Sequence, residues 1–255
     1  MPKNAAHGRI VWHDLVTPDH VGAKAFYTQV APWKTQPWED AREYEMWTLH
    51  GEPIGGLTSM SAELRAGGVP PHWLAYVCVY DVDACARQAE SLGGRVVMGP
   101  TEVPHVGCWA VVRDPQGATI GVFEPADTPP GHDGTPTIGE FSWHELATDD
   151  FRAAADFYRA LFRWEKTSEY DMGEMGIYYM FGQRGQVYGG IFKRPPQLPV
   201  SSWLCYLHVD SVRPVAEKVK QLGGTVMNGP MEVPGGDWIA QCSDPQGAAF
   251  ALHAK

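Results

Sequence analysis

The stretch at residues 92–123, LGGRVVMGPTEVPHVGCWAVVRDPQGATIGVF, decides the fold because the chain repeats it at residues 222–253 as LGGTVMNGPMEVPGGDWIAQCSDPQGAAFALH. In both copies LGG is followed by GP, EVP and DPQGA, and each of these motifs is offset by 130 residues. Such self-similarity predicts a tandem duplication, in which one structural unit occurs twice in the chain.

The repeat also covers the start of each half. The sequence IVWHDLV at residues 10–16 returns as FSWHELA at residues 141–147. Each is followed by a predicted helix that carries a Phe-Tyr pair, Phe26-Tyr27 in the first half and Phe157-Tyr158 in the second. The duplication therefore spans nearly the whole chain.

Length and composition fit two globular domains. The 255 residues correspond to about two domains of roughly 100–200 residues each. An apolar share of 44% with 20% charged residues is enough to bury a core in each half. Residues 124–138, EPADTPPGHDGTPTI, are rich in Pro and Gly and lack periodicity, which is typical of a linker. We predict a first domain at 9–125, a linker at 126–138 and a second domain at 139–255.

Charge excludes some classes of partner. The formal net charge is −10, and no run of Lys or Arg is longer than two residues. Nucleic acids and anionic membranes both require clustered cations, so we expect neither as a partner. No apolar run approaches the roughly 18 residues of a membrane span.

Cysteine usage indicates a reducing compartment. The chain has an odd number of widely spaced cysteines and no Cys-x-x-Cys pair: Cys78, Cys85, Cys108, Cys205 and Cys242. The first residues are polar and do not resemble a signal peptide. We therefore predict reduced thiols and a cytoplasmic protein.

In each half, the sequence predicts the same pattern of a strand, a helix and further strands two times in succession. In the first half a strand at 9–16 precedes a helix at 20–30, for which Asp19 is a plausible N-cap. Extended segments at 44–49 and 53–60 follow, and the Gly- and Pro-containing segment 61–71 is expected to be a surface loop.

The pattern then recurs within the same half. A strand at 73–80 precedes a helix at 84–92, which Asp81 or Asp83 would cap. Gly93 would close this helix in the left-handed conformation. Three further strands are expected at 95–98, 108–113 and 118–123, and DPQG between the last two has the composition of a type I turn. Strands dominate, so the predicted class is α+β.

These motifs together resemble the vicinal oxygen chelate superfamily, which includes glyoxalase I, bleomycin-binding proteins and extradiol dioxygenases. The resemblance rests on the Trp-His-Asp/Glu-Leu strand, the capped Phe-Tyr helix, the LGG after the second helix and the DPQG turn. It implies tandem glyoxalase-like domains built from four βαβββ modules, which form two curved mixed sheets with clefts. It also implies that metal-dependent relatives hold an ion with His and Glu on the first and last strands of their modules.

At the ligand positions of those relatives, this sequence has residues without a suitable lone pair. Aligned on the Phe-Tyr and DPQG motifs, those positions fall on Trp12, Leu74, Gly121, Trp143, Leu204, Ala251 and the pairs Gly55-Gly56 and Gly189-Gly190. An indole, an isobutyl group and a glycine hydrogen do not coordinate divalent ions. The resemblance thus predicts a site with neither metal nor cofactor in both copies.

The residues in register with these positions are candidates for ligand binding. Trp12 and Trp143 would form a stacking floor for a flat apolar or aromatic molecule. Tyr76 and Tyr206 are expected on the cleft-facing side of their strands, where they could supply hydroxyl groups. Asp14 and Glu145 lie two residues beyond the tryptophans, on the same face of each strand. These two carboxylates are the candidates for acid/base catalysis.

Histidines leave a second possibility open. His13 and His144 alternate with the inward positions and are expected to face away from the cleft. His208 and His253 have the inward phase and, with Glu145, make up the ligand set of a non-haem iron triad. Their counterparts in the first copy are Cys78, Phe123 and Asp14, which do not make up that set, so only the second copy could hold a relocated metal.

The favoured interpretation is a metal-independent protein that binds an apolar or aromatic small molecule. The alternative is a glyoxalase-like lyase, isomerase or oxygenase that uses Asp14 or Glu145, or the histidine set on a metal. A structural or partner-binding role is the third. The fused copies supply the pairing that single-repeat relatives obtain as homodimers, so a monomer and a homodimer are both possible. The ligand set predicted for the favoured interpretation is Trp12, Asp14, Tyr76, Trp143, Glu145, Tyr206, His208 and His253.

Overall fold

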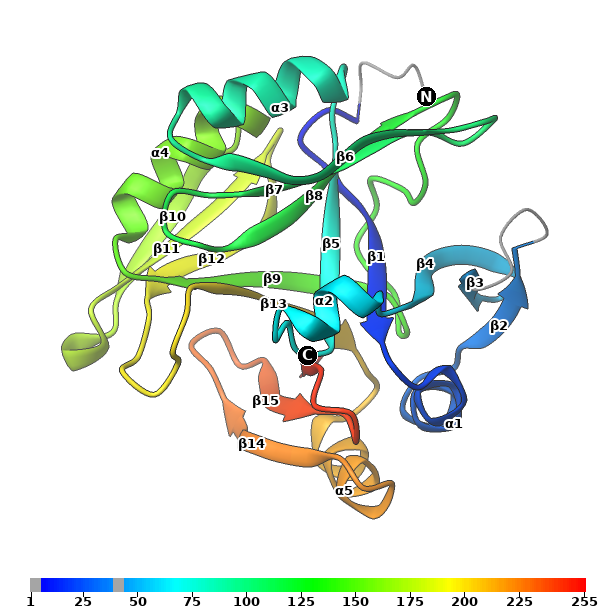
Figure 1. Cartoon of the computed structure of the whole chain (residues 1–255). Helices are drawn as coiled ribbons and strands as arrows, with labels where there is room; N and C mark the ends of the chain where they lie inside the picture. Colours follow the sequence, from blue (N-terminus) through cyan, green and yellow to red (C-terminus); the bar gives the residue numbers. More distant parts are fainter. Residues whose placement is uncertain (1–5, 39–43) are drawn as a thin grey trace. The chain divides into compact units, whose positions relative to one another are not determined.

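The computed structural model describes residues 6–38 and 44–255 (Figure 1). The first half contains β1 (Ile10–Thr17), α1 (His20–Val30), β2 (Lys34–Pro37), β3 (Tyr44–Leu49), β4 (Glu52–Ser59), α2 (Ala62–Ala66), β5 (His72–Cys78), α3 (Val82–Ser91), β6 (Arg95–Val103), β7 (Gly107–Arg113) and β8 (Thr119–Pro125). The second half contains β9 (Phe141–Thr148), α4 (Phe151–Phe162), β10 (Glu165–Asp171), the 3₁₀ turn η2 (Gly173–Met175), β11 (Ile177–Gln183), β12 (Gln186–Lys193), β13 (Ser202–His208), α5 (Val212–Gln221), β14 (Thr225–Glu232), β15 (Trp238–Ser243) and β16 (Ala249–Ala254).

Aspartates begin three of the main helices. The side chain of Asp19 accepts a hydrogen bond from Gly22 N at the start of α1, and Asp81 accepts one from Ala84 N at the start of α3. Asp150 accepts from two backbone N–H groups in the first turn of α4. These caps satisfy donors that the helix itself leaves unpaired. Gly93 has a φ of 85° just after α3, as the LGG motif predicts.

The strands form two eight-stranded mixed sheets. Their orders are β2-β3-β4-β1-β5-β8-β7-β6 and β10-β11-β12-β9-β13-β16-β15-β14. The first strand of each module pairs in parallel with its last, as in β1 with β4 and β5 with β8, and the connections between the others are antiparallel hairpins. This is the predicted α+β arrangement of βαβββ modules. No helix among the described residues is long and apolar enough to cross a membrane.

Two compact units divide the chain differently from the repeat. Among the described residues, unit 1 comprises 6–11, 75–131 and 144–203, and unit 2 comprises 12–38, 44–74, 132–143 and 204–255. Each unit therefore combines a module from the first copy with a module from the second. Within unit 1 helix α3 contacts α4, and within unit 2 helix α1 contacts α5.

A buried Tyr–Asp hydrogen bond joins the two copies within unit 1. Tyr158 on α4 donates to Oδ2 of Asp114 over 2.9 Å, and the indole of Trp203 donates to the Tyr158 oxygen over 3.2 Å. Asp114 also accepts from the backbone N–H groups of Gln116 and Ala118, so it holds its own turn closed. The Phe-Tyr helix of the second copy is thus anchored to the DPQG turn of the first.

Unit 2 contains the reciprocal contact. Tyr27 on α1 donates to Oδ2 of Asp244 over 3.2 Å, and Trp73 donates to the Tyr27 oxygen over 2.9 Å. Phe26, next to Tyr27, packs edge to face on Phe250 of the final strand, with centroids 5.9 Å apart. The two most recognisable motifs of the repeat therefore bind each other across copies, not within a copy.

The structure differs from the sequence predictions in local detail. The segment 61–71, predicted to be a loop, contains α2, whose first turn is capped by Ser61 accepting from Leu64 N. The short strand β2 was not predicted, because its sequence, KTQP, has little strand character apart from its pairing with β3. The strand predicted at 95–98 continues to Val103 as β6.

We expect Tyr158→Phe to lower the free energy of unfolding by about 1–3 kcal/mol, because the buried carboxylate of Asp114 loses its hydroxyl donor. Equilibrium urea denaturation measures the change. The control is Tyr170→Phe, since Tyr170 is 52% exposed. The free energy of unfolding of this variant should stay within about 0.5 kcal/mol of wild type. Equal stabilities of Tyr158→Phe and wild type would contradict the anchoring role.

A second prediction concerns pH. Burial raises the pKa of Asp244 above its ordinary value of 3.8, although hydrogen bonds from Ala248 N, Gln246 N and Tyr27 oppose the shift. The folded chain therefore holds this proton to higher pH than the unfolded chain does. The resulting stabilisation is complete below the unfolded pKa and is lost as the pH rises through the folded pKa.

The unfolding free energy of wild type minus that of Asp244→Asn should therefore fall as the pH rises above 3.8, and then level off. Urea titrations of both proteins across the acid range measure this difference. A difference that grows with pH over the same range would show that the folded pKa is lowered instead.

Candidate functional site

A compact polar cluster surrounds the first candidate tryptophan, in unit 2. Trp12 and Asp14 are two residues apart on β1 and so share one face of the strand. The indole N–H of Trp12 lies 2.8 Å from Oδ1 of Asp14 and 2.9 Å from the hydroxyl oxygen of Tyr44, and donates to both. The Tyr44 hydroxyl in turn donates to the same Asp14 oxygen over 2.8 Å. Trp12 is half-buried, whereas Asp14 is only 7% exposed.

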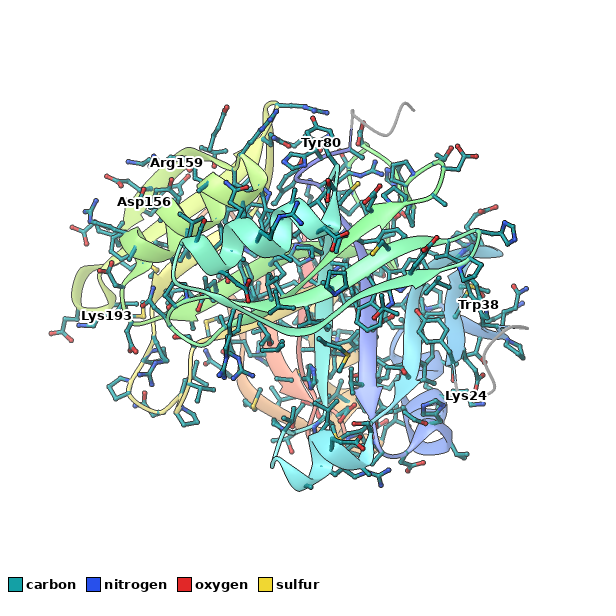
Figure 2. The ribbon with its side chains drawn as sticks, turned by 45° about the horizontal axis from the view of Figure 1, so that its top comes forward. Lys24, Trp38, Tyr80, Asp156, Arg159 and Lys193 are labelled. Atoms are coloured by element: carbon teal, nitrogen blue, oxygen red, sulfur yellow. The ribbon has the colours of Figure 1, made fainter. Side chains whose placement is uncertain are left out.

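The electrostatics of this cluster keep Tyr44 protonated. Burial, together with the neighbouring carboxylate of Asp14, raises the pKa of Tyr44 far above its ordinary value of 10.0. A phenol in this state acts as a hydrogen-bond donor and holds the carboxylate in one orientation. Trp38, which is labelled in Figure 2, packs edge to face on the Tyr44 ring, with centroids 6.2 Å apart.

A glycine makes this arrangement possible. Gly56 on β4 lies opposite Asp14 on β1 and opposite Met46 on β3. A Cβ atom at Gly56 would collide with the Tyr44 hydroxyl and with Oδ1 of Asp14. The second glycine of the Gly55-Gly56 pair therefore provides the space in which tyrosine and carboxylate meet.

The second copy builds the same pair in unit 1. Tyr178 on β11 donates to Oε1 of Glu145 on β9 over 2.7 Å. A Cβ atom at Gly190 would collide with the Tyr178 ring, which also stacks on Phe192 with centroids 5.8 Å apart. Both copies thus contain a carboxylate held by a tyrosine over a glycine.

Sequence reasoning missed the two tyrosines. A signal for them was nevertheless present, because Tyr44 and Tyr178 are separated by 134 residues, the same offset that relates Gly56 to Gly190. The tyrosine positions lie outside the segments where the repeat is most obvious, and their role depends on strand pairing.

The two predicted tyrosines are both buried. Tyr76 is buried, lies directly against Gly121 and packs edge to face on Trp109, with centroids 6.5 Å apart. Tyr206 is 1% exposed, and its hydroxyl oxygen accepts a hydrogen bond from Gln241 Nε2 over 3.4 Å. Their part in ligand binding stays a prediction.

His208 and His253 lie together in unit 2, with ring centroids 5.5 Å apart. Nδ1 of His208 is 3.1 Å from the Pro136 carbonyl oxygen. The two nitrogens of His253 are held by Ser142 Oγ and Asp237 Oδ2. Glu145, the third member of the predicted ligand set, belongs to unit 1 and contacts Tyr178.

His13 and His144 are both 6% exposed. His13 stacks on Phe141 with centroids 3.9 Å apart. Nδ1 of His144 is 3.2 Å from the Tyr188 carbonyl oxygen, and burial lowers the pKa of His144 to about 4. His144 is therefore neutral at pH 7. Burial and stacking fit the structural role expected for this pair.

The residues at the family's metal positions do not fit a divalent ion. The indole N–H of Trp12 is a donor already engaged by Asp14 and Tyr44. Trp143, the counterpart of Trp12, is also an indole, and the other positions carry alkyl groups or glycine, with no lone pair to offer: Leu74, Leu204, Gly121, Ala251, Gly55-Gly56 and Gly189-Gly190. Both the chemistry and the hydrogen bonding at these positions argue against the family's usual metal site.

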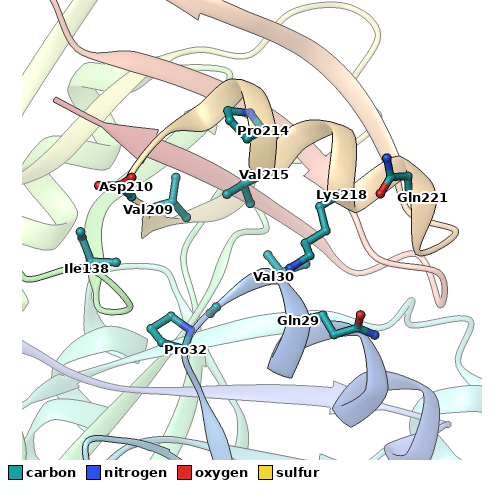
Figure 3. Close-up of a pocket in the computed structure, with 11 residues that line it drawn as sticks. Gln29, Val30, Pro32, Ile138, Val209, Asp210, Pro214, Val215, Lys218 and Gln221 are labelled. Carbon is teal, nitrogen blue, oxygen red and sulfur yellow. The ribbon is translucent and has the colours of Figure 1, made fainter.

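A separate groove lies between helices of unit 2 (Figure 3). Its volume is about 560 Å³. Val30 at the end of α1 and Pro32 just beyond it face Val215 and Lys218 on α5. None of the predicted ligand-binding residues lines it. The groove is therefore distinct from the site built around Trp12.

Comparison with known families supports the resemblance. The model of the Glyoxalase/Bleomycin resistance protein/Dioxygenase superfamily matches residues 9–122 and again 138–252. The chain belongs to this superfamily. Superfamily membership accounts for the paired modules and for the mixed sheets, but it leaves the chemistry of each site to the local side chains.

Two relatives that match over nearly the whole chain have different names. "Putative glyoxylase CFP32" of Mycobacterium tuberculosis is 32% identical over 99% of this chain and 97% of its own length. "Anthracycline biosynthesis protein DnrV" of Streptomyces peucetius is 28% identical over 97% of this chain and 93% of its own.

Among solved structures, a homoprotocatechuate 2,3-dioxygenase from Arthrobacter globiformis has a TM-score of 0.67 at 13% identity, covering 97% of this chain and 79% of that one. The Mn(II)-bound glyoxalase from Novosphingobium aromaticivorans has a TM-score of 0.61 at 16% identity, covering 96% and 81%. At these identities the likeness shows the fold alone.

We expect Gly190→Ala to destabilise the protein by about 1–3 kcal/mol, because the added methyl group overpacks the contact with Tyr178. In the double variant Gly190→Ala/Tyr178→Ala the methyl group has room, so its cost should largely disappear. Thermal or urea unfolding of the wild type, both single variants and the double variant completes the cycle. Additive effects of the two substitutions would contradict the proposed close approach.

Proposed function

We propose that this protein binds a planar, hydroxylated aromatic small molecule without a metal ion. The observation that carries the proposal is the fixed polar cluster around Trp12. The resemblance aligns Trp12, and Trp143 in the second copy, with a ligand position of metal-dependent relatives. An indole provides a large rigid surface for stacking at little cost in conformational entropy.

The carboxylate–tyrosine pairs supply polar recognition, and in the first copy the pair contacts the Trp12 indole directly. Asp14 and Glu145 are each oriented by a tyrosine hydroxyl at 2.7–2.8 Å. An ionised carboxylate offers about four lone-pair sites, so it can also accept from phenolic hydroxyls of a ligand. A mainly apolar surface with a few oriented polar groups is typical of small-molecule sites.

The printed names of two relatives support this class of ligand. DnrV and DauV are both named anthracycline biosynthesis proteins, and DauV of Streptomyces sp. is 28% identical over 97% of this chain. Anthracyclines are fused, planar ring systems with phenolic hydroxyls. A ligand of that shape matches an indole floor flanked by hydrogen-bond acceptors.

A titration with 1,4-dihydroxyanthraquinone tests the proposal. Binding should quench tryptophan fluorescence and saturate, and Trp12→Ala or Trp143→Ala should weaken the affinity of its site about tenfold, which is about 1.4 kcal/mol. EDTA should leave the affinity unchanged, and Tyr170→Phe serves as the matched surface control. The proposal would be contradicted if quenching did not saturate, or if both tryptophan variants bound the anthraquinone with the affinity of the wild type.

A second candidate function is acid/base catalysis of the glyoxalase-like lyase, isomerase or oxygenase type. The observation in its favour is the short hydrogen bond from Tyr44 to the buried Asp14, since buried carboxylates beside a proton donor suit proton transfer. Any turnover found for a small-molecule substrate should fall about 100-fold or more in Asp14→Asn or Glu145→Gln. Unchanged turnover in both variants would exclude these carboxylates from catalysis.

A further inference from the structure

Ser142, His253 and Asp237 form a continuous hydrogen-bonded chain in unit 2. Ser142 Oγ lies 2.8 Å from Nδ1 of His253, and Nε2 of His253 lies 3.0 Å from Oδ2 of Asp237. Ser142 is half-buried, the His253 side chain is 12% exposed and the Asp237 side chain is 41% exposed. The three residues come from the start of β9, from β16 and from the residue just before β15.

The direction of these hydrogen bonds follows from the chemistry of the groups. An ionised carboxylate only accepts, so Nε2 of His253 carries the hydrogen that Asp237 binds. Nδ1 of the neutral imidazole then has a lone pair, and Ser142 donates its hydroxyl hydrogen to it. The Tyr206 carbonyl, at 3.4 Å, is a more distant acceptor for the same hydroxyl. His253 is thereby oriented as a base toward Ser142.

The first copy lacks all three residues. At the corresponding offsets it has Val11 for Ser142, Phe123 for His253 and Gly107 for Asp237. The scaffold therefore forms with apolar side chains and glycine at these places, so the fold does not require the polar chain. Partly buried polar groups lose hydration on folding, and an apolar set of similar shape avoids that loss.

We propose that Ser142 is a nucleophile that accepts acyl groups from small carboxylic esters, with His253 as its base and Asp237 as the residue that positions the imidazole. A hydroxyl, an imidazole and a carboxylate within hydrogen-bonding distance in this order are the elements of serine acyl transfer. This activity does not depend on the aromatic binding proposed above, although His253 also belongs to the ligand set predicted from the sequence.

The reaction balances with water as the only second reactant. Ser142 Oγ adds to the acyl carbon while His253 Nδ1 takes its proton. The bond to the alcohol oxygen then breaks, and His253 returns the proton to that oxygen. Water attacks acyl-Ser142 by the same proton transfers, so one ester and one water give one acid and one alcohol.

Diisopropyl fluorophosphate and 4-nitrophenyl acetate test the proposal on the full chain. The fluorophosphate should add one phosphoryl group per chain, and peptide mass spectrometry should locate it on Ser142. Ser142→Val, which copies the first half, should abolish both the labelling and the hydrolysis. His253→Gln should lower the labelling rate about 100-fold. Ser168→Ala, a change in the other unit, should leave labelling as in wild type.

Asp237→Asn separates positioning from structure. Loss of the carboxylate removes the acceptor that orients Nε2–H of His253, so the labelling rate should fall while the melting temperature stays near wild type. Asp237→Glu, which keeps a carboxylate, should restore part of the rate. Wild-type protein that gains no label at Ser142, or that hydrolyses the ester no faster than Ser142→Val, would overturn the proposal. These results do not depend on fluorescence quenching by the anthraquinone, so the two proposals can fail separately.

Discussion

A buried hydrogen bond between tyrosine and aspartate is the constraint on which both compact units depend. In unit 1 Tyr158 of the second copy donates to Asp114 of the first, and in unit 2 Tyr27 of the first donates to Asp244 of the second. Burial disfavours the charged form of each aspartate and so raises its pKa, and the hydrogen bonds that the carboxylate accepts oppose this shift. The contact therefore ties helix to turn and makes each copy of the repeat incomplete without the other.

Strand pairing around this core creates the candidate site. The parallel pairing of β1 with β4 brings Gly56 opposite Asp14, and this glycine leaves room for Tyr44 to bind the carboxylate. The same construction holds Glu145 and Tyr178 in the second copy. The scaffold thus fixes the orientation of a carboxylate beside an indole, whereas the positions used for metal binding elsewhere in the superfamily carry no suitable donors.

The sequence predicted local structure better than it predicted contacts between residues that are distant in the chain. Helix starts such as Asp19, the left-handed Gly93 and the module pattern follow from propensities and caps within a few residues. The association of Tyr158 with Asp114, 44 residues away, depends on which modules pack together, and an internal repeat is compatible with either choice. The roles of Tyr44 and Asp237 were not predicted for the same reason, since each depends on a hydrogen bond to a residue on another strand.

The most direct test of metal-independent binding is elemental analysis of protein purified without a histidine tag, combined with an anthraquinone titration of the same sample. We predict well below one equivalent of Fe, Mn, Ni or Zn per chain, together with saturable binding by that metal-poor protein. A stoichiometric metal that is required for binding would contradict the proposal that indoles, and not an ion, receive the ligand.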